Sequence, residues 1–322
     1  ATRPLGRTGI EVSEVGFGGA PLGELFEPVP EDQAQATLAQ AWQGGIRYYD
    51  TSPFYGYGKS EHRLGHYLRQ QDRSDFVLST KVGRIFKPTR KSDFDPDGWV
   101  GGMSFDFHFD YTYDGIMRSW EDSTQRLGFH DIDVLLIHDL DSFFMNKRRF
   151  DTYLGQLMTS GWRALEELRD AGLIRGIGAG INKPGNIPHF LDAVDVDMFL
   201  VAMPYTLLDQ GVLDDEFPAC AERGVNFVIG AVFASPDEGE NPNAVAAIRS
   251  GRLSRIWSPP QDSLLDFIIS RPAQAGRVIS DRLNPTNDVA FRLIGHSFTE
   301  VRSTDLESIK EAKIVAYERE SE

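Results

Sequence analysis

Four ionisable side chains early in the chain are of the types that together interconvert a carbonyl and an alcohol. Asp50, Lys81 and His138 each end an apolar run, and Tyr55 follows closely after Asp50. A tyrosine titrates near pH 10, too high for easy proton exchange at neutrality. A nearby ammonium lowers that pKa, a carboxylate can hold the ammonium, and a neutral imidazole can orient the substrate oxygen. Grouped together, these side chains would form a proton donor and acceptor.

These residues meet only if the fold brings the ends of several strands together. The apolar runs expected to be strands are residues 14–19, 46–50, 76–81, 133–138, 174–180, 198–203, 225–233 and 291–295. Helical segments precede several of these runs and end in glycine, which closes a helix in the left-handed conformation. They are residues 34–45, 118–128, 161–172 and 217–224. The repeated helix–glycine–strand unit predicts an α/β fold, a (β/α)₈ TIM barrel, with its active site at the C-terminal strand ends.

Two segments interrupt this alternation within what we expect to be one domain, residues 1–322. Residues 84–114 form a long loop after the third strand, rich in glycine and aromatic residues, which would lie over the active site. Its alternating aromatic residues indicate either a pocket lining or a small β-hairpin; they are Phe105, Phe107, Phe109, Tyr111 and Tyr113. Arg84 and Trp99 are substrate-pocket candidates by their position in this loop. Residues 235–290 are polar and proline-rich, and the C-terminal third, residues 235–322, is expected to be irregular.

Charge and composition limit the partners of the protein. The formal net charge of −15 argues against nucleic acid, which requires clustered Lys and Arg. No apolar run approaches the roughly 20 residues that cross a bilayer, and ATRPLGRTG lacks the apolar core of a signal peptide. We therefore expect a cytoplasmic protein that acts on a small molecule, with no membrane partner. The sequence gives no basis for an oligomeric state.

The segment GYGKS looks like the end of a phosphate-binding loop but does not complete one. Pro53 stands where the loop needs a glycine. We expect Lys59 and Ser60 to begin a helix instead, with Ser60 as its N-cap. His62 and His66 have the spacing of metal ligands, yet no further ligands are evident, and no metal site is predicted.

At these motifs the chain resembles the aldo-keto reductase superfamily. DTSPFYGYGKSE matches its Asp-Thr-x-x-x-Tyr-Gly-x-Gly-x-x-Glu signature, LSTKVG and LLIHD supply its lysine and histidine, and LGRTGIEVSEVGFGG is similar to its N-terminal hairpin and first strand. By this resemblance Tyr55 would be the acid/base and Lys81 the partner that lowers its pKa. Asp50 would anchor the lysine, and His138 would orient the substrate.

Three longer segments resemble one branch of that superfamily, the NAD-dependent D-threo-aldose (L-fucose) 1-dehydrogenases and pyridoxal 4-dehydrogenases. They are GGMSFDFHFDYTYDGIMRSWEDSTQRLG, GIGAGIN and YTLLDQGVLDDEFPACAERGV. The resemblance implies an enzyme that oxidises a cyclic hemiacetal to a lactone and reduces NAD. Two alternatives remain open: an NADPH-dependent carbonyl reductase, and a non-enzymatic barrel that binds a nucleotide.

The resemblance also implies a set of cofactor contacts. Asn182 matches the asparagine that hydrogen-bonds the nicotinamide carboxamide. The other expected contacts are Gly19, Asp50, Tyr205, Phe233, Ser235, Gly295 and Ser297. Gly230 stands where the family has an aromatic that stacks on the nicotinamide, which leaves Phe233 or Tyr205 as substitutes. The segment IGHSFTEV lacks the usual Arg or Lys for a 2′-phosphate, which favours NAD over NADP.

Overall fold

A computed structural model describes residues 2–202, 205 and 211–231. The chain divides into two units, residues 1–204 with 211–230, and residues 205–210 with 231–322. Every helix and strand of the described residues lies in the first unit.

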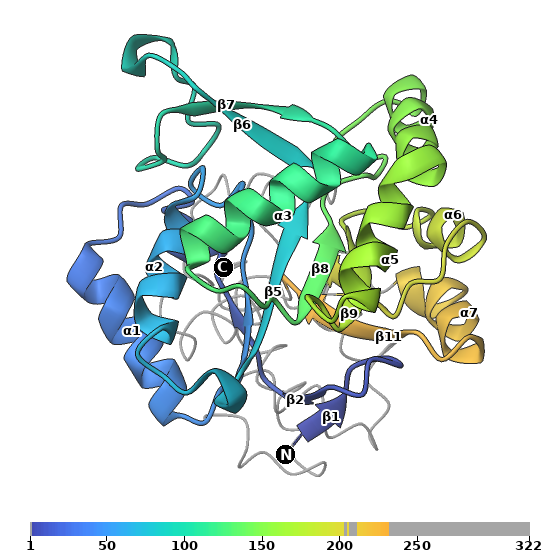
Figure 1. The fold of residues 1–322 in the computed structure, drawn as a ribbon, viewed down its shortest axis with the longest axis horizontal. Helices are drawn as coiled ribbons and strands as arrows, with labels where there is room; N and C mark the ends of the chain where they lie inside the picture. Colours follow the sequence, from blue (N-terminus) through green and yellow to red (C-terminus); the bar gives the residue numbers. More distant parts are fainter. Residues whose placement is uncertain (1, 203–204, 206–210, 232–322) are drawn as a thin grey trace, which may run out of the picture. The chain divides into compact units, whose positions relative to one another are not determined.

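A sheet of parallel strands forms the centre of this unit (Figure 1). Its strands are β3 (Phe17–Gly18), β4 (Tyr48–Asp50), β5 (Val77–Val82), β8 (Val134–Ile137), β9 (Gly176–Ile181), β10 (Met198–Ala202) and β11 (Asn226–Gly230). They lie in the order β11-β10-β9-β8-β5-β4-β3. Strands β5, β8 and β9 are buried along their whole length, as continuous apolar runs in parallel sheets usually are. The first seven predicted strands are confirmed, and the eighth, residues 291–295, lies outside the described residues.

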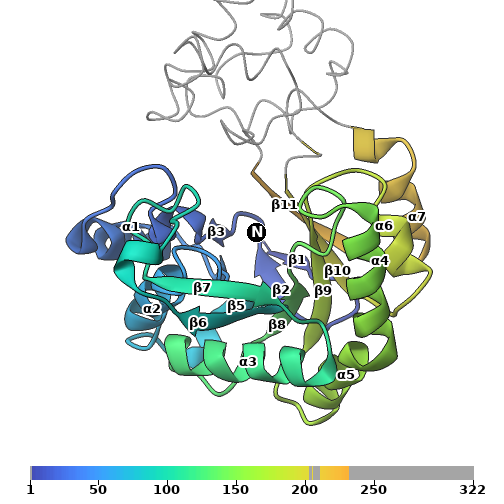
Figure 2. The same cartoon turned by 90° about the horizontal axis from the view of Figure 1, so that it is seen from above.

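Helices alternate with these strands and cover the outer face of the sheet (Figure 2). They are α1 (Glu31–Gln43), α2 (Lys59–Leu68), α3 (Tyr113–Leu127), α4 (Lys147–Gln156), α5 (Trp162–Asp170), α6 (Ile187–Leu191) and α7 (Glu216–Glu222). A π-helical turn, Leu157–Gly161, joins α4 to α5. Short 3-10 turns cover Ala20–Gly23, Arg73–Asp75, Lys91–Asp93 and Gly211–Leu213. The fold is a parallel β/α barrel, as predicted. Within the described ranges, no helix is long and apolar enough to span a bilayer.

The N-terminal residues form the predicted hairpin, in which β1 (Thr2–Pro4) pairs antiparallel with β2 (Glu11–Ser13). This segment contributes the buried residues Leu5, Ile10 and Val12 to one apolar cluster. The cluster also contains Tyr48, Val77, Val134 and Met198, which stand at the starts of four barrel strands. The hairpin therefore packs against the N-terminal end of the barrel, opposite to the predicted active site.

The insertion after β5 forms a second hairpin, in which β6 (Arg84–Pro88) pairs antiparallel with β7 (Phe105–Phe109). Its phenylalanines are half-buried, while Asp106 and His108 between them are exposed. Gly83 makes the turn into β6 at φ +109, where a Cβ would meet the ring of Tyr111 at 2.3 Å. Of the two interpretations of the aromatic alternation, the hairpin is confirmed for Phe105, Phe107 and Phe109, while Tyr111 follows the strand and Tyr113 begins helix α3.

Candidate active site

Strands β4 and β5 bring Asp50 and Lys81 together at their C-terminal ends. Lys81 Nζ donates to Asp50 Oδ2 at 2.7 Å and to the carbonyl of Thr51 at 2.8 Å. The other oxygen of Asp50 accepts a hydrogen bond from Ser79 Oγ at 2.7 Å. Lys81 is only 2% exposed, so its ammonium requires this paired carboxylate to remain charged. The predicted anchoring of Lys81 by Asp50 is present in the structure.

Tyr55 lies in the loop between β4 and α2, directly over this ion pair. Lys81 Nζ is 4.6 Å from the centroid of the Tyr55 ring. The His138 ring meets the same ring edge-on, with centroids 6.0 Å apart at 87°. The four residues predicted to be catalytic, which three strand ends and one loop supply, thus surround one point.

The pKa of Tyr55 reflects two opposing influences. Burial raises this pKa, and the Lys81 ammonium lowers it only in part, so the phenol titrates above its ordinary value. Lys81 therefore acts in the predicted direction, but the net shift is upward. Burial would lower the pKa of Lys81, but the charges of Asp50 and Tyr55 and their hydrogen bonds together outweigh burial, and the pKa is raised. The site holds an ammonium beside a protonated phenol at neutral pH.

His138 directly follows β8 and is buried beside a second ion pair, Arg84–Asp139. Its Nδ1 lies 3.0 Å from Ser52 Oγ and 3.1 Å from Arg84 Nη1. Burial, with the positive charges of Arg84 and Lys81, lowers the pKa of His138 well below its usual value. The neutral imidazole, which can donate one hydrogen bond to a substrate oxygen, is therefore the form favoured here.

Asn182, the predicted nicotinamide contact, follows β9 at the same edge of the barrel. Its side-chain Nδ2 donates to Asp139 Oδ1 at 2.9 Å and to Asp141 Oδ2 at 3.1 Å. Because two carboxylates accept both amide hydrogens, the carbonyl Oδ1 is the group left to accept a hydrogen bond from a nicotinamide carboxamide. This donor set fits the nicotinamide end of the cofactor.

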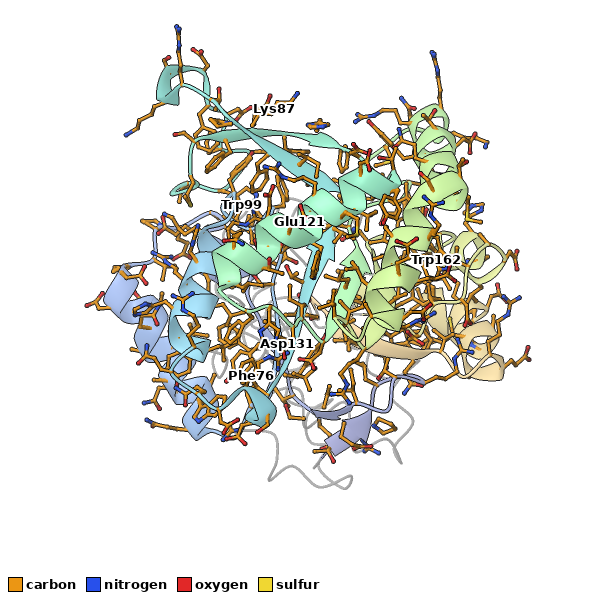
Figure 3. All side chains as sticks on the ribbon, in the orientation of Figure 1. Phe76, Lys87, Trp99, Glu121, Asp131 and Trp162 are labelled. Atoms are coloured by element: carbon orange, nitrogen blue, oxygen red, sulfur yellow. The ribbon has the colours of Figure 1, made fainter. Side chains whose placement is uncertain are left out.

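The two predicted substrate contacts, Arg84 and Trp99, also reach the site. The indole of Trp99 lies against Tyr55, with ring centroids 5.5 Å apart, and is 4% exposed. Figure 3 shows Trp99 between the β6–β7 hairpin and helix α2. Arg84 begins strand β6 and is likewise buried, with Nη1 2.6 Å from Asp139 Oδ2. The insertion thus places aromatic rings and one cation beside the four residues predicted to be catalytic.

The remaining predicted cofactor contacts divide into two groups. Gly19 is buried beside the site, where its N–H donates to the carbonyl of Asp50 at 2.7 Å. Tyr205 belongs to the second unit. Phe233, Ser235, Gly295 and Ser297 lie outside the described residues. The cofactor contacts remain predictions.

The predicted N-cap of helix α2 was wrong. The helix begins at Lys59, and its N-cap is Gly58 at φ +99, a conformation that glycine adopts without strain. Ser60 lies within the first turn, and its hydroxyl donates to the carbonyl of Gly19 at 2.7 Å. Its side chain therefore connects the helix to the first barrel strand and does not cap the helix.

Sequence reasoning missed three polar residues that support the site. Ser52 and Ser79 bond His138 and Asp50, and Asp139 bonds both Arg84 and Asn182. Ser52 and Asp139 lie within the sequence motifs DTSPFYG and LLIHD, which also contain Tyr55 and His138. This closeness along the chain is the signal that could have identified them. Nothing in the spacing pairs Arg84 with Asp139.

Comparison with known proteins identifies relatives of this chain. Residues 14–236 match the Aldo/keto reductase family. A pyridoxal 4-dehydrogenase of Microbacterium luteolum is 43% identical over 260 residues, which cover 77% of this chain and 73% of that protein. A D-threo-aldose 1-dehydrogenase of a Pseudomonas species is 38% identical over 238 residues, covering 70% and 68%. A glycerol dehydrogenase structure from Gluconobacter oxydans, 16% identical, superposes with a TM-score of 0.59 over 97% of this chain and 94% of that one, a likeness of fold alone.

Proposed function

The chain belongs to the aldo/keto reductase family of NAD(P)-dependent oxidoreductases, and from this premise we propose that it oxidises a cyclic hemiacetal to a lactone. The hemiacetal would be an aldose such as L-fucose, or a pyridoxal-like compound. One observation carries the proposal: the Lys81–Asp50 ion pair lies directly beneath the Tyr55 ring, with His138 at its edge. The names of the two relatives at about 40% identity support the substrate class.

A hemiacetal carbon carries a hydroxyl and a hydrogen, and the reaction removes both. The nicotinamide supplies the hydride acceptor when it is bound. Tyr55 acts as the base in its phenolate form, after the phenol has released its own proton to solvent, and the Lys81 ammonium stabilises that form. The phenolate oxygen then takes the hydroxyl proton of the substrate. His138, neutral, donates a hydrogen bond to the same substrate oxygen and so directs the C–H bond. The proton ends on Tyr55 and the two electrons leave with the hydride.

We propose NAD as the cofactor in preference to NADP. The support is the segment IGHSFTEV, residues 294–301, which lacks the Arg or Lys that would pair with a 2′-phosphate. Isothermal titration of the protein with each dinucleotide tests this preference. NAD is expected to bind more tightly, and NADP binding at least as tightly as NAD would overturn it.

The substrate class is tested by absorbance at 340 nm with NAD and a panel of L-fucose, D-arabinose, L-galactose and pyridoxal. Turnover of one member is the expected result. No signal with the panel, together with reduction of aldehydes by NADPH, would show a carbonyl reductase instead. No signal in either assay, with dinucleotide binding intact, would show a non-catalytic nucleotide-binding barrel.

A further inference from the structure

A buried cation contacts the catalytic histidine from outside the barrel sheet. Arg84, from the β6–β7 hairpin, is 3% exposed. Its guanidinium carbon lies 3.9 Å from the centroid of the Phe54 ring and 4.9 Å from those of Phe107 and Phe109. A buried guanidinium is stable only when paired, and Asp139 is the partner, at 2.6 Å. Three rings and one carboxylate therefore fix the position of this charge.

The donors around His138 decide which ring nitrogen carries its proton. Arg84 Nη1 can only donate, because a guanidinium has no acceptor, and it lies 3.1 Å from Nδ1. Ser52 Oγ, 3.0 Å from the same nitrogen, accepts the N–H of Phe54 and can donate its own hydrogen. Nδ1 must then offer its lone pair. The neutral ring therefore carries its proton on Nε2.

The carboxylate of Asp139 connects this histidine to the predicted nicotinamide contact. Its Oδ2 pairs with Arg84 and lies 3.2 Å from His138 Nε2, while its Oδ1 accepts from Asn182 Nδ2. Asp139 holds this position at φ +52, in the left-handed region that few residues other than glycine adopt. Strain of this kind persists only where surrounding contacts impose it. One side chain thus orients groups on both sides of the site.

We propose that Arg84 and Asp139 are positioning residues, which together hold His138 as the neutral Nε2–H tautomer and fix the amide orientation of Asn182. The proposal deepens the proposed function and rests on it for the roles of His138 and Asn182. It gives Arg84 a role other than the substrate contact expected from its loop position. The Arg84–Asp139 ion pair thus determines which nitrogen of His138 carries the proton. It also determines which way the Asn182 amide faces the nicotinamide.

Charged and titratable groups from several elements face His138. They are Arg84 from β6, Lys81 from β5, Tyr55 from the β4–α2 loop, Asp139 from its own strand end, and Tyr111, whose hydroxyl donates to the His138 carbonyl. The two cations disfavour the imidazolium, while Asp139 favours it. Removal of the Arg84 charge would leave the Asp139 carboxylate beside the ring without its cation. The protonated imidazolium would then be stabilised relative to the neutral ring.

The test is nitrogen NMR of histidine-labelled full-length protein without cofactor, titrated between pH 5 and pH 8. His138→Gln assigns the resonance by its disappearance. Wild type is expected to show a neutral Nε2–H ring across pH 6–8. In Arg84→Met, the pKa of His138 should rise by at least about one unit, as expected when an adjacent opposite charge is left unopposed. Arg84→Lys keeps a cation and should keep most of the neutral state.

Two results would overturn the proposal: an Nδ1–H tautomer in wild type, or an unchanged His138 titration and tautomer in Arg84→Met. Arg126→Met is the matched control, because Arg126 also pairs with a buried carboxylate, Glu61, beneath a phenyl ring at 5.3 Å. Its guanidinium bonds Glu61 and Ser123, not the site. This variant should leave the His138 resonance unchanged.

If Arg84→Met does not fold, Asp139→Asn provides the second measurement. The remaining cation should then hold His138 neutral to still lower pH, while the Asn182 amide loses one of its two acceptors. The dissociation constant for NAD should rise at least about threefold, and an unchanged constant with an unchanged titration would refute the role of Asp139. These readouts need no substrate. Failure of the hemiacetal panel would therefore refute the proposed function and leave this inference to be decided by NMR.

Discussion

At the scale of single residues, the site works through the protonation state that each group is forced to hold. Tyr55 is a weak acid made weaker by burial, and Lys81 recovers part of that loss. His138 is kept neutral by burial and by two nearby cations. Each protonation state depends on residues in direct contact with the group. Single substitutions should therefore change catalysis, cofactor binding or stability one at a time.

Replacement of Tyr55 by Phe removes the proton acceptor and leaves the Lys81–Asp50 pair in place. We expect hemiacetal oxidation to fall by at least about 10²-fold, the usual contribution of a general acid or base, with NAD binding unchanged. The measurements are initial rates at 340 nm and calorimetric titration. Tyr57→Phe is the control, because this nearby tyrosine donates to the carbonyl of Asp95 and should keep its rate. Near-wild-type turnover of Tyr55→Phe would contradict the assignment.

The lowered pKa of His138 makes stability depend on pH in a definite direction. In the unfolded chain the imidazole titrates near its ordinary value of 6.5, whereas in the folded protein it takes up a proton only at much lower pH. As the pH falls below 6.5, the unfolded state binds a proton that the native state does not. The free energy of unfolding should then fall by up to about 1.4 kcal/mol per pH unit.

Urea unfolding at pH 7.5 and pH 5.5 measures this loss, and His138→Gln is the comparison. Other groups titrate in both proteins, so the difference between the two pH slopes isolates His138. The variant should lose less stability on acidification than wild type. Equal slopes would show that the imidazole is not held neutral by the fold.

At the scale of elements, the site depends on how closely helices and strands approach one another. Helices α2 and α3 pack side by side, and Gly65 of α2 lies against Leu127, the last residue of α3. A Cβ at Gly65 would meet the backbone carbonyl oxygen of Leu127 at 2.2 Å. Because α2 begins just after Tyr55, the position of this helix also bears on the catalytic loop.

Gly65→Ala should therefore destabilise the protein, by about 1–3 kcal/mol as for an overpacked core. Gly155→Ala in helix α4 is the matched control, because nothing lies within 4 Å of its Cβ position. That substitution should stabilise the protein by about 0.5–1 kcal/mol, the ordinary preference of a helix for alanine. The midpoints of urea unfolding compare the two variants, and shifts of the same sign would contradict the packing argument.

At the scale of the whole barrel, stability and chemistry lie at opposite ends of the strands. The N-terminal hairpin buries Leu5 and Ile10 among residues that start the strands. The four residues proposed to be catalytic stand at or just after the C-terminal ends of β4, β5 and β8. In barrels of this kind, residues at the N-terminal end usually stabilise the fold and residues at the C-terminal end carry the chemistry.

Leu5→Ala removes buried apolar atoms from the cluster at the N-terminal end. We expect a loss of about 2–5 kcal/mol in the free energy of unfolding, the range for such truncations, measured by urea denaturation. The turnover of folded enzyme and its NAD affinity should not change, because the tetrad lies at the other end. A fall in kcat at temperatures where the variant is fully folded would show that the two ends are coupled.

The sequence by itself determined the barrel strands of the described residues and located the four residues predicted to be catalytic. Continuous apolar runs between helical segments have a length and period that suit a buried parallel strand, and a residue that ends such a run must lie at the edge of the sheet. The motif around Tyr55 could likewise be recognised from consecutive residues alone. The alternation in residues 105–109 was ambiguous, because a pocket wall and a hairpin have the same period of two.

Only the tertiary structure decided the contacts between distant segments. Arg84 and Asp139 are far apart in sequence and pair because a hairpin folds over a strand end, which no spacing encodes. Ser60 could cap a helix by residue type, but the nearby carbonyl of Gly19 and the left-handed Gly58 decided otherwise. The net pKa of Tyr55 likewise depended on burial, which is a property of the packed molecule. Local pattern fixes where a side chain stands along its strand, whereas its partners and its charge depend on what the fold packs around it.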